Sequence, residues 1–172
     1  MTVRTSGVIF IHSASSALRP HIDWAVSAAC GAPIRLSWTR QPADPALWRA
    51  ERRWHGVAGT SAIITSELKR CTQARYEVTE EPTATTEGMR YTYTPRLGLF
   101  SGRIGPSGDI VVPEERLRAA LDRHRSSRRD REARASLETE LAYLIGEPWD
   151  DELEIFRYAG DVEPTPWLRQ VG

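Results

Sequence analysis

The chain has 172 residues, 40% of them hydrophobic, so it can bury a core of its own and is expected to fold around one main domain. Basic and acidic residues both number 23, which excludes a global field that would draw the whole chain to nucleic acid or to an anionic membrane. The two cysteines lie far apart without zinc-ligand spacing, and no leader or long apolar run is present. We therefore expect a cytoplasmic protein without a disulfide, a membrane span or a cofactor.

The first part of the chain predicts six elements in the order strand, helix, strand, strand, helix, strand. A short apolar run after Gly7 is typical of a buried central strand, and helical spacing then continues from Pro20 until Gly31. Alternating apolar residues predict two half-exposed strands, and a helix capped by Thr60 or Ser61 precedes the last strand. The predicted strands are 8–11, 34–39, 48–54 and 74–82, and the predicted helices are 20–30 and from residue 60 or 61 to 71.

This order of elements predicts an α+β fold over residues 7–82. With short connections and right-handed crossovers, it corresponds to the ferredoxin-like (βαββαβ) antiparallel sheet, in which the first strand is internal and both helices cover one face. Two further segments, "GMRYTYTP" and "LGLFSGRIGPSGDIVVP", predict a strand and then a C-terminal hairpin that turns at Pro106 and Gly108. We expect both segments to extend the sheet.

Helices complete the predicted fold. Pro113 opens a helix, and because the apolar stripe of its first half would lie opposite that of its second half, we expect a break near residue 126. A short helix that starts with acidic residues is predicted over 150–158. We therefore divide the chain into an α+β sheet domain, 1–112, and a helical C-terminal extension, 113–172, packed on the same core.

The stretch after the first strand carries the candidate ligand site. It joins the end of a central strand to a helix start, where free N–H groups and the helix dipole attract an anion such as a phosphate or a carboxylate. The alternative interpretation is structural and simpler, since serine is favoured beside helix starts: a serine caps the helix, the histidine is satisfied internally and the arginine is solvated. The candidate residues are His12, Ser13, Ser15, Ser16, Arg19 and His21.

Common enzyme signatures are absent from the sequence, which has no GxSxG, GxxxxGK[ST] or HExxH motif. Two functions of different classes remain. The first is a non-catalytic module that binds a small anionic regulator or a partner protein, including a second copy of the chain. The second is an enzyme of unfamiliar type, in which His12 acts as acid or base beside the anion site. The module requires no set of catalytic residues that the sequence lacks, so we expect no catalytic residue. Convergence of His12, Asp23 and another titratable group on one concave pocket would favour the enzyme.

Trp38, Trp48 and Trp54 alternate with polar residues along the predicted strands. They would form either a stacking platform for bases or part of the core. We expect core packing, because a sheet covered by two helices needs large apolar side chains. The opposite face of residues 48–55 is mixed in charge and does not predict a nucleic-acid surface.

Charge is segregated toward the C-terminus. Residues 116–134 carry eight arginines and three acidic residues, whereas residues 147–163 carry seven acidic residues and one arginine. In a functional arrangement, the arginines would contact RNA or an acidic partner, and the carboxylates would bind a metal ion. In a structural arrangement, the arginines would form a solvated helix face or pair with the acidic segment. The acidic residues lack the spacing of oxygen ligands found in an EF-hand loop, so we expect the structural arrangement and no metal site. We expect at most weak, salt-sensitive RNA binding through Arg123–Arg134.

Four blocks span most of the chain: "HSASSALRPHIDWAVSAACG", "RYEVTEEP", "RYTYTPRLGLFSGRIGPSGDIVVPEERLRAAL" and "PWDDELEIFRYAG". Together they resemble the actinobacterial family known as domain of unknown function 3145. The resemblance implies a cytoplasmic actinobacterial protein. Because that family has no assigned activity, the resemblance implies no catalytic or binding residue.

Overall fold

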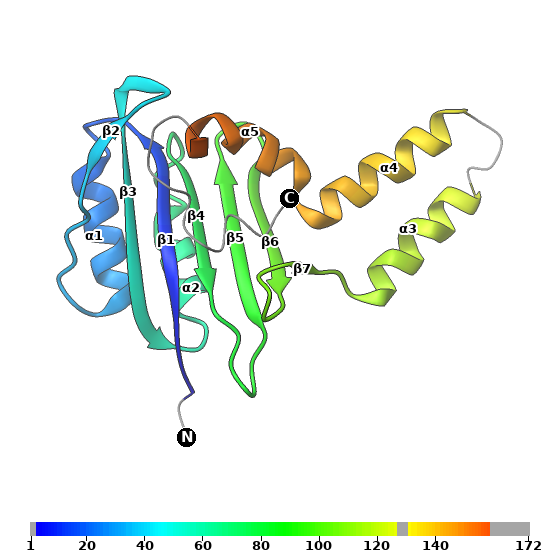
Figure 1. Ribbon diagram of the computed structural model, residues 1–172, viewed down its shortest axis with the longest axis horizontal. Coiled ribbons are helices and arrows are strands. Elements are labelled where there is room, and N and C mark those ends of the chain that lie inside the picture. The colour runs from blue at the N-terminus through cyan, green and yellow to red at the C-terminus, as the bar shows by residue number, and fades with distance from the viewer. Residues whose placement is uncertain (1–2, 127–130, 159–172) are drawn as a thin grey trace.

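A seven-stranded antiparallel sheet runs through the computed structural model, which describes residues 3–126 and 131–158, apart from the side chains of 131–136 and 158. Its strands stand in the order β2-β3-β1-β4-β5-β6-β7 (Figure 1). They are β1 (Arg4–Ala14), β2 (Thr39–Gln41), β3 (Asp44–Val57), β4 (Arg75–Glu80), β5 (Gly88–Thr94), β6 (Gly98–Ile104) and β7 (Ile110–Val111). The helices are α1 (Arg19–Cys30), α2 (Thr60–Leu68), α3 (Glu114–Ser126), α4 (Arg131–Ile145) and α5 (Glu147–Tyr158). The prediction of an α+β fold built on an antiparallel sheet is confirmed.

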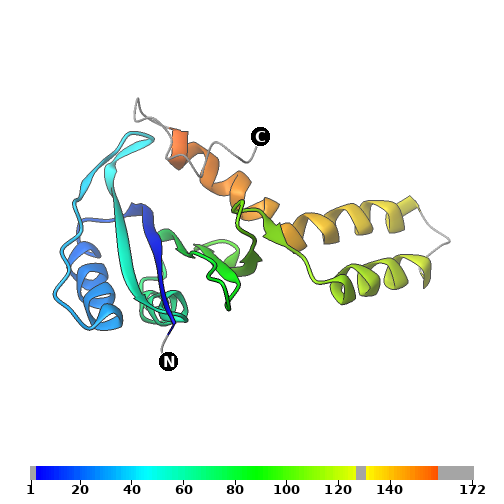
Figure 2. The same ribbon diagram turned by 60° about the horizontal axis from the view of Figure 1, so that its bottom comes forward.

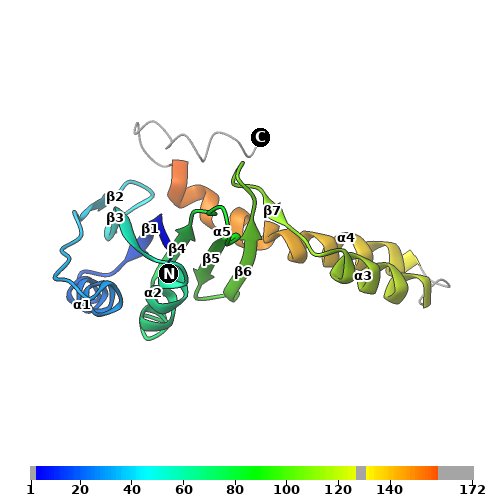
Figure 3. The same ribbon diagram turned by 90° about the horizontal axis from the view of Figure 1, so that it is seen from below.

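β1 lies inside the sheet, between β3 and β4, and divides its side chains between two environments. Because side chains alternate along a strand, Ile9 and Ile11 point to one face, and Phe10 and His12 to the other. α1 and α2 pack against each other on the first face, and α5 covers part of the second (Figures 2 and 3). The core between the sheet and the first two helices includes Ile9, Ile11, Ile22, Val26, Ile64, Leu68, Tyr76 and Val78.

The prediction of a strand over residues 34–39 is wrong. β2 begins only at Thr39, and side chains of α1 hold the preceding residues. The N–H of Ile34 donates to Ser27 Oγ at 2.8 Å, and that of Leu36 donates to Asp23 Oδ1 at 3.2 Å. The apolar alternation of this segment thus reflects packing over α1, which periodicity alone does not distinguish from a strand.

The predicted cap of α2 is also wrong. Its N-cap is Gly59, with φ of 91°. The hydroxyl of Thr60 donates to the carbonyl oxygen of Val57, whereas Glu80 of β4 accepts hydrogen bonds from the N–H groups of Gly59 and Ser61. A carboxylate from a neighbouring strand therefore satisfies the free donors at this helix start and complements its dipole.

α3 and α4 form an antiparallel pair that extends away from the sheet, and α5 then returns to it (Figures 1 and 3). We call this pair the helical arm. α3 ends at Ser126, beside the predicted break, and residues 127–130 lie outside the described residues. α5 begins at Glu147, three residues before its predicted start. Among the described residues, no helix combines the length and apolar composition needed to cross a membrane. The division of the chain at residue 112 stays a prediction.

Candidate functional site

The structure divides the six candidate residues instead of bringing them to one point. His12 is fully buried on the face of the sheet that α5 covers, and Ser13 is buried beside it. Ser16 and Arg19 line a groove along α1, on the opposite side of the sheet, and His21 is exposed. Only Ser16 and Arg19 are therefore brought together in an open site.

No loop serine caps α1 through its side chain. The N-cap is Leu18, which has no side-chain cap hydrogen bond, and its own N–H donates to the carbonyl oxygen of Ser15 at 3.1 Å. Pro20, in the first turn, has no N–H to satisfy. The part of the alternative interpretation in which a serine caps this helix is therefore wrong, whereas its expectation of an internal partner for His12 agrees with the contact between His12 Nε2 and Glu77 Oε2. The Ser16 side chain stays exposed at the end of the groove.

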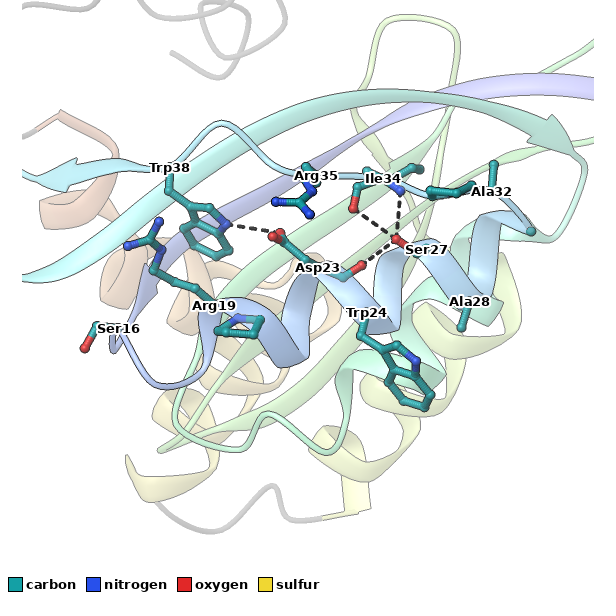
Figure 4. Close-up of a pocket in the computed structure, with 13 residues that line it drawn as sticks. Ser16, Arg19, Asp23, Trp24, Ser27, Ala28, Ala32, Ile34, Arg35 and Trp38 are labelled. Carbon is teal, nitrogen blue, oxygen red and sulfur yellow. Dashed lines mark hydrogen bonds between the residues drawn. The ribbon is translucent and has the colours of Figure 1, made fainter.

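The groove lies between α1 and the extended segment 32–38 (Figure 4). α1 fastens this segment through two side chains. Asp23 Oδ1 accepts hydrogen bonds from the N–H of Leu36 and, at 3.1 Å, from Trp38 Nε1. One turn later, Ser27 Oγ accepts from the N–H of Ile34 and lies 3.0 Å from its carbonyl oxygen. These bonds fix the far wall of the groove in place.

Arg19 is held at one end of the groove by aromatic rings. Its guanidinium carbon lies 4.0 Å from the ring centroid of Trp48 and 5.6 Å from that of Trp38. Arg40 stacks on Trp48 as well, at 4.2 Å. Both distances to Trp48 are typical of cation–π contacts, which orient a guanidinium without using its N–H donors.

Among the described residues, no protein acceptor pairs with the Arg19 side chain. Its Nε is buried without a hydrogen-bond partner, and no ion pair within 4 Å involves Arg19, Arg35 or Arg40 in the part of the chain that the structure describes. Asp23 is the carboxylate of this groove, and it already accepts two hydrogen bonds through one of its oxygens. Arg40 donates to the carbonyl oxygen of Pro45 at 3.0 Å, so within the described residues Arg19 is the guanidinium that leaves this end of the groove electropositive.

Such an arrangement suits an anionic group. A guanidinium presents two parallel N–H donors to a carboxylate or phosphate, and the Ser16 hydroxyl at the same end is a further donor. Trp24, 62% exposed, also lines the groove and adds a flat apolar surface at its outer edge, where the ring projects from α1 away from segment 32–38 (Figure 4). The groove can thus hold a small ligand with a negatively charged end and an apolar or planar body.

A second polar cluster lies on the opposite face of the sheet, beneath α5, and is mostly buried, with Asp150 at its more exposed side. Its centre is Glu77 of β4, which is buried. His12 Nε2 lies 2.5 Å from Glu77 Oε2, and both Arg90 and Arg157 donate to Glu77 Oε1 at 2.7 Å. Asp150 of α5 accepts from the same two arginines. Two carboxylates and two guanidiniums thus neutralise each other in one buried network.

The network sets the protonation states of His12 and Glu77. Burial lowers the pKa of His12, so the ring is neutral at pH 7. Burial alone would raise the pKa of Glu77, but the nearby guanidiniums of Arg90 and Arg157 and the hydrogen bond from His12 outweigh it and hold that pKa well below its usual range. Because an ionised carboxylate only accepts, the neutral ring carries its proton on Nε2. His12 Nδ1 has no partner among the described residues.

We expect His12 to make the protein less stable below about pH 6.5, the value at which an unperturbed histidine titrates. Its folded-state pKa is lowered, so between that pKa and about 6.5 the unfolded chain binds a proton that the folded chain does not. Stability therefore falls as pH falls through this window, by at most about 1.4 kcal/mol per pH unit. His12→Gln keeps an N–H donor for Glu77 but cannot titrate in this window. Its free energy of unfolding, measured in urea at pH 7.5 and 5.5, should therefore fall less between the two pH values than that of the wild type.

The control for this measurement is His55→Gln, at an exposed position on β3, which should keep the wild-type slope. An equal slope in the wild type and in His12→Gln would show that His12 does not carry the pH dependence.

The acidic residues of α5 pair with arginines of the sheet. Besides Asp150, Glu152 contacts Arg75 at 3.3 Å and Arg96 at 3.2 Å. Asp150 and Glu152 therefore do not form the expected ion pairs with the Arg-rich segment 116–134. Three described arginines of that segment pair within the helical arm instead: Arg118 with Glu114, Arg123 with Glu140, and Arg125 with Asp122.

The three tryptophans have different roles. Trp54 is buried in the core, as predicted, and its Nε1 donates to the carbonyl oxygen of Thr79. Trp38 packs partly against the core, yet it also lies with Trp48 against Arg19. Sequence reasoning found Arg19 but missed the aromatic rings that hold it.

Sequence reasoning also missed the network beneath α5, because Glu77 and Arg90 occupy strand positions that read as solvated. Alternation along a strand shows which face a side chain points to. It does not show that a distant helix covers that face. Within the described residues, no group of three or more His, Cys, Asp and Glu side chains could hold a metal ion.

Comparisons with known proteins give one match. A family model described as "Protein of unknown function (DUF3145)" matches residues 8–170. No curated protein matches the chain, and no solved structure matches it. The match covers the sheet, the helical arm and α5, but its description carries no activity.

Proposed function

The chain belongs to the DUF3145 family of unknown function, and from this premise we propose that it is a non-catalytic module that binds the anionic group of a small regulator in the Arg19 groove. The observation that supports this function is the state of the Arg19 guanidinium. It is stacked on Trp48 at 4.0 Å, and its Nε is buried without a partner among the described residues. A guanidinium that is already oriented, with no ion pair to break, binds a phosphate or carboxylate at a reduced entropic cost.

The geometry supports an enzyme less well. A general acid or base must come within hydrogen-bonding reach of the reacting group. His12, the expected acid or base, lies on the face that α5 covers and is bonded to Glu77, whereas Asp23 lines the groove on the other side of the sheet. Two of the titratable groups whose convergence would favour catalysis are thus separated by the sheet.

We also propose that β1 to β4, with α1 and α2, form a ferredoxin-like unit. The order β2-β3-β1-β4 and the position of both helices on one face support this assignment. A cytoplasmic location and an actinobacterial source are proposals of the same kind. They are supported by the absence of cysteine pairing signals and by a composition in which Lys69 is the only lysine. The fold does not select the ligand, because such sheets serve many unrelated functions.

Arg19→Ala is expected to abolish stabilisation by an anionic ligand. We suggest thermal melts of the full chain with inorganic phosphate, a nucleoside monophosphate and citrate, which differ in anionic group and body. A ligand at about 100 times its Kd adds about 2.7 kcal/mol to the free energy of unfolding. In a chain of this length that raises the Tm by roughly 5–10 °C. Arg19→Ala should show no such rise relative to its own ligand-free melt.

Two further variants make the result specific. Arg70→Ala removes an exposed arginine elsewhere and should keep the full rise in Tm. Arg19→Lys keeps the charge but loses the planar pair of donors, so it should keep only part of the rise. If none of the anions stabilises the wild type, or if Arg19→Ala responds as strongly as the wild type, the proposed function is wrong.

A further inference from the structure

The helical arm has an incompletely buried apolar side. In the 13 residues of α3 only Ala120 is buried. Four large apolar side chains of the arm remain between 37% and 46% exposed, and they are Leu117, Leu121, Leu141 and Ile145. Two helices alone cannot enclose a core, so half-exposed side chains of this kind are usually covered by further helices.

The four side chains lie on one side of the arm. Leu117 and Leu121 stand one turn apart on α3, as Leu141 and Ile145 do on α4. The ion pair between Arg123 and Glu140 bridges the two helices. At about 100° per residue, each member of this pair points at least about 100° away from the two half-exposed apolar residues of its own helix. The ion pair therefore closes one side of the arm, and the four apolar residues form the other, which we call the apolar seam.

Charges of opposite sign flank the apolar seam. By the same helical geometry, Arg125 stands beside Leu121 at the outer edge of α3, and Glu138 stands beside Leu141 at the outer edge of α4. The Arg123–Glu140 contact fixes the register of the two helices, so that Arg125 and Glu138 lie near the same level along the arm. Arg125 thus places a positive charge at one edge of the seam, where it also pairs with Asp122 of its own helix, and Glu138 places a negative charge at the other edge.

We propose that the apolar seam binds the seam of a second copy of this chain, with α3 of each copy over α4 of the other. Turning one arm over onto the other in this way places Arg125 of each copy opposite Glu138 of the second copy. Each contact occurs twice, as a symmetric dimer requires. The chain has no formal net charge, so two copies do not repel each other. The result is a four-helix bundle, which covers all eight apolar side chains.

The size of the seam predicts a reversible dimer. α3 and α4 have 13 and 15 residues, so each is about 20 Å long, and two adjacent helices are about 20 Å wide. Such a face buries on the order of 500 Å² per copy, which is less than the roughly 800 Å² of a standard stable interface. We therefore expect a Kd on the order of micromolar, with dimer and monomer in exchange.

Sedimentation velocity of the full chain, from low micromolar to about millimolar concentration, tests the proposal. The wild type should convert from monomer to dimer over this range. The double variant Leu117→Ser, Leu121→Ser should raise the Kd about 100-fold or more, with helix content by circular dichroism showing that the arm is still folded. Ile63→Ser, which replaces an exposed isoleucine on α2, is the matched control and should leave the Kd unchanged. A chain that stays monomeric throughout, or a dimer that the double variant does not weaken, overturns the proposal.

A charge exchange tests the arrangement of the two copies. Glu138→Arg alone and Arg125→Glu alone should each weaken the dimer, because each places like charges across the interface. The double variant Glu138→Arg, Arg125→Glu restores opposite charges and should return the Kd to within a few-fold of the wild type. A double variant weaker than both single variants would rule out α3 packing over α4 of the second copy. A monomer whose seam binds a heterologous helix would show that the occupant is a different protein.

Discussion

Glu77→Gln is expected to reduce the free energy of unfolding by about 3–5 kcal/mol, the range for removing one partner of a buried ion pair. The carboxylate of Glu77 is buried and lies 2.7 Å from both Arg90 and Arg157. A neutral amide leaves two mostly buried guanidiniums opposite Asp150 alone, and its NH₂ group cannot accept from either of them. Urea unfolding at pH 7, monitored by tryptophan fluorescence, measures the loss.

The control for this prediction is Glu87→Gln, which removes an exposed carboxylate that is 3.0 Å from Arg103. Exposed pairs contribute little, so this variant should stay within about 1 kcal/mol of the wild type. The depressed pKa of Glu77 adds a second readout. Its stabilisation is present above the unfolded-state pKa of about 4.3 and is lost as pH falls through the folded-state pKa. Glu77→Gln should lack this acid-dependent loss; equal stability of the two variants at pH 7 would contradict the role given to Glu77.

Gly7→Ala is expected to cost about 3 kcal/mol, at the upper end of the range for overpacking. A Cβ at this position of β1 would lie 1.8 Å from the carbonyl oxygen of Thr79 and 2.7 Å from the ring of Trp54. The first contact is with backbone of the adjacent strand, and it cannot be relieved by a rotamer change. The ring of Trp54 is pinned as well, because its Nε1 donates to the same carbonyl oxygen at 3.2 Å. Thermal and urea unfolding of the variant measure the cost.

Gly105→Ala is the matched substitution. Its new Cβ would meet Val111 at 3.5 Å, an ordinary contact, and Gly105 is not among the glycines with positive φ. This variant should unfold within about 1 kcal/mol of the wild type. If Gly7→Ala were as stable as Gly105→Ala, β1 and β4 would have to move apart at no cost to the free energy of unfolding. Their antiparallel pairing makes that outcome unexpected.

Most of the fold could be predicted from the sequence, because its signals are local. The apolar run at 8–11 marked a central strand, the spacing after Pro20 marked α1, and the Pro106 and Gly108 pair marked the turn before β7. The errors occurred where a side chain from elsewhere in the chain satisfies the backbone. Segment 34–38 alternates like a strand but hydrogen-bonds to Asp23 and Ser27 of α1. The first N–H groups of α2 are satisfied by Glu80, which is 19 residues from Ser61.

The candidate site was predicted only in part. Arg19 and Ser16 were expected because serine and arginine beside a helix start are a local pattern. The stacking of Arg19 on Trp48 could not be predicted, because it depends on the pairing of β1 with β3, which brings Trp48 opposite Ala14. His12 was grouped with Arg19 by closeness in sequence. The strand pleat directs His12 to the face beneath α5, whereas Arg19 begins α1, which packs on the other face of the sheet.

The sequence by itself determined the class of the fold, the positions of most elements and the balance of charge, since each depends on residue type and on spacing within one element. Tertiary structure alone decided which charges are buried together. Glu77, Arg90 and Arg157 come from three separate elements, and they meet because α5 returns across the sheet after the helical arm. Tertiary structure also decided that the apolar residues of the arm stay half exposed. Helical periodicity shows that a helix has an apolar face, but the contacts between elements determine whether anything covers that face.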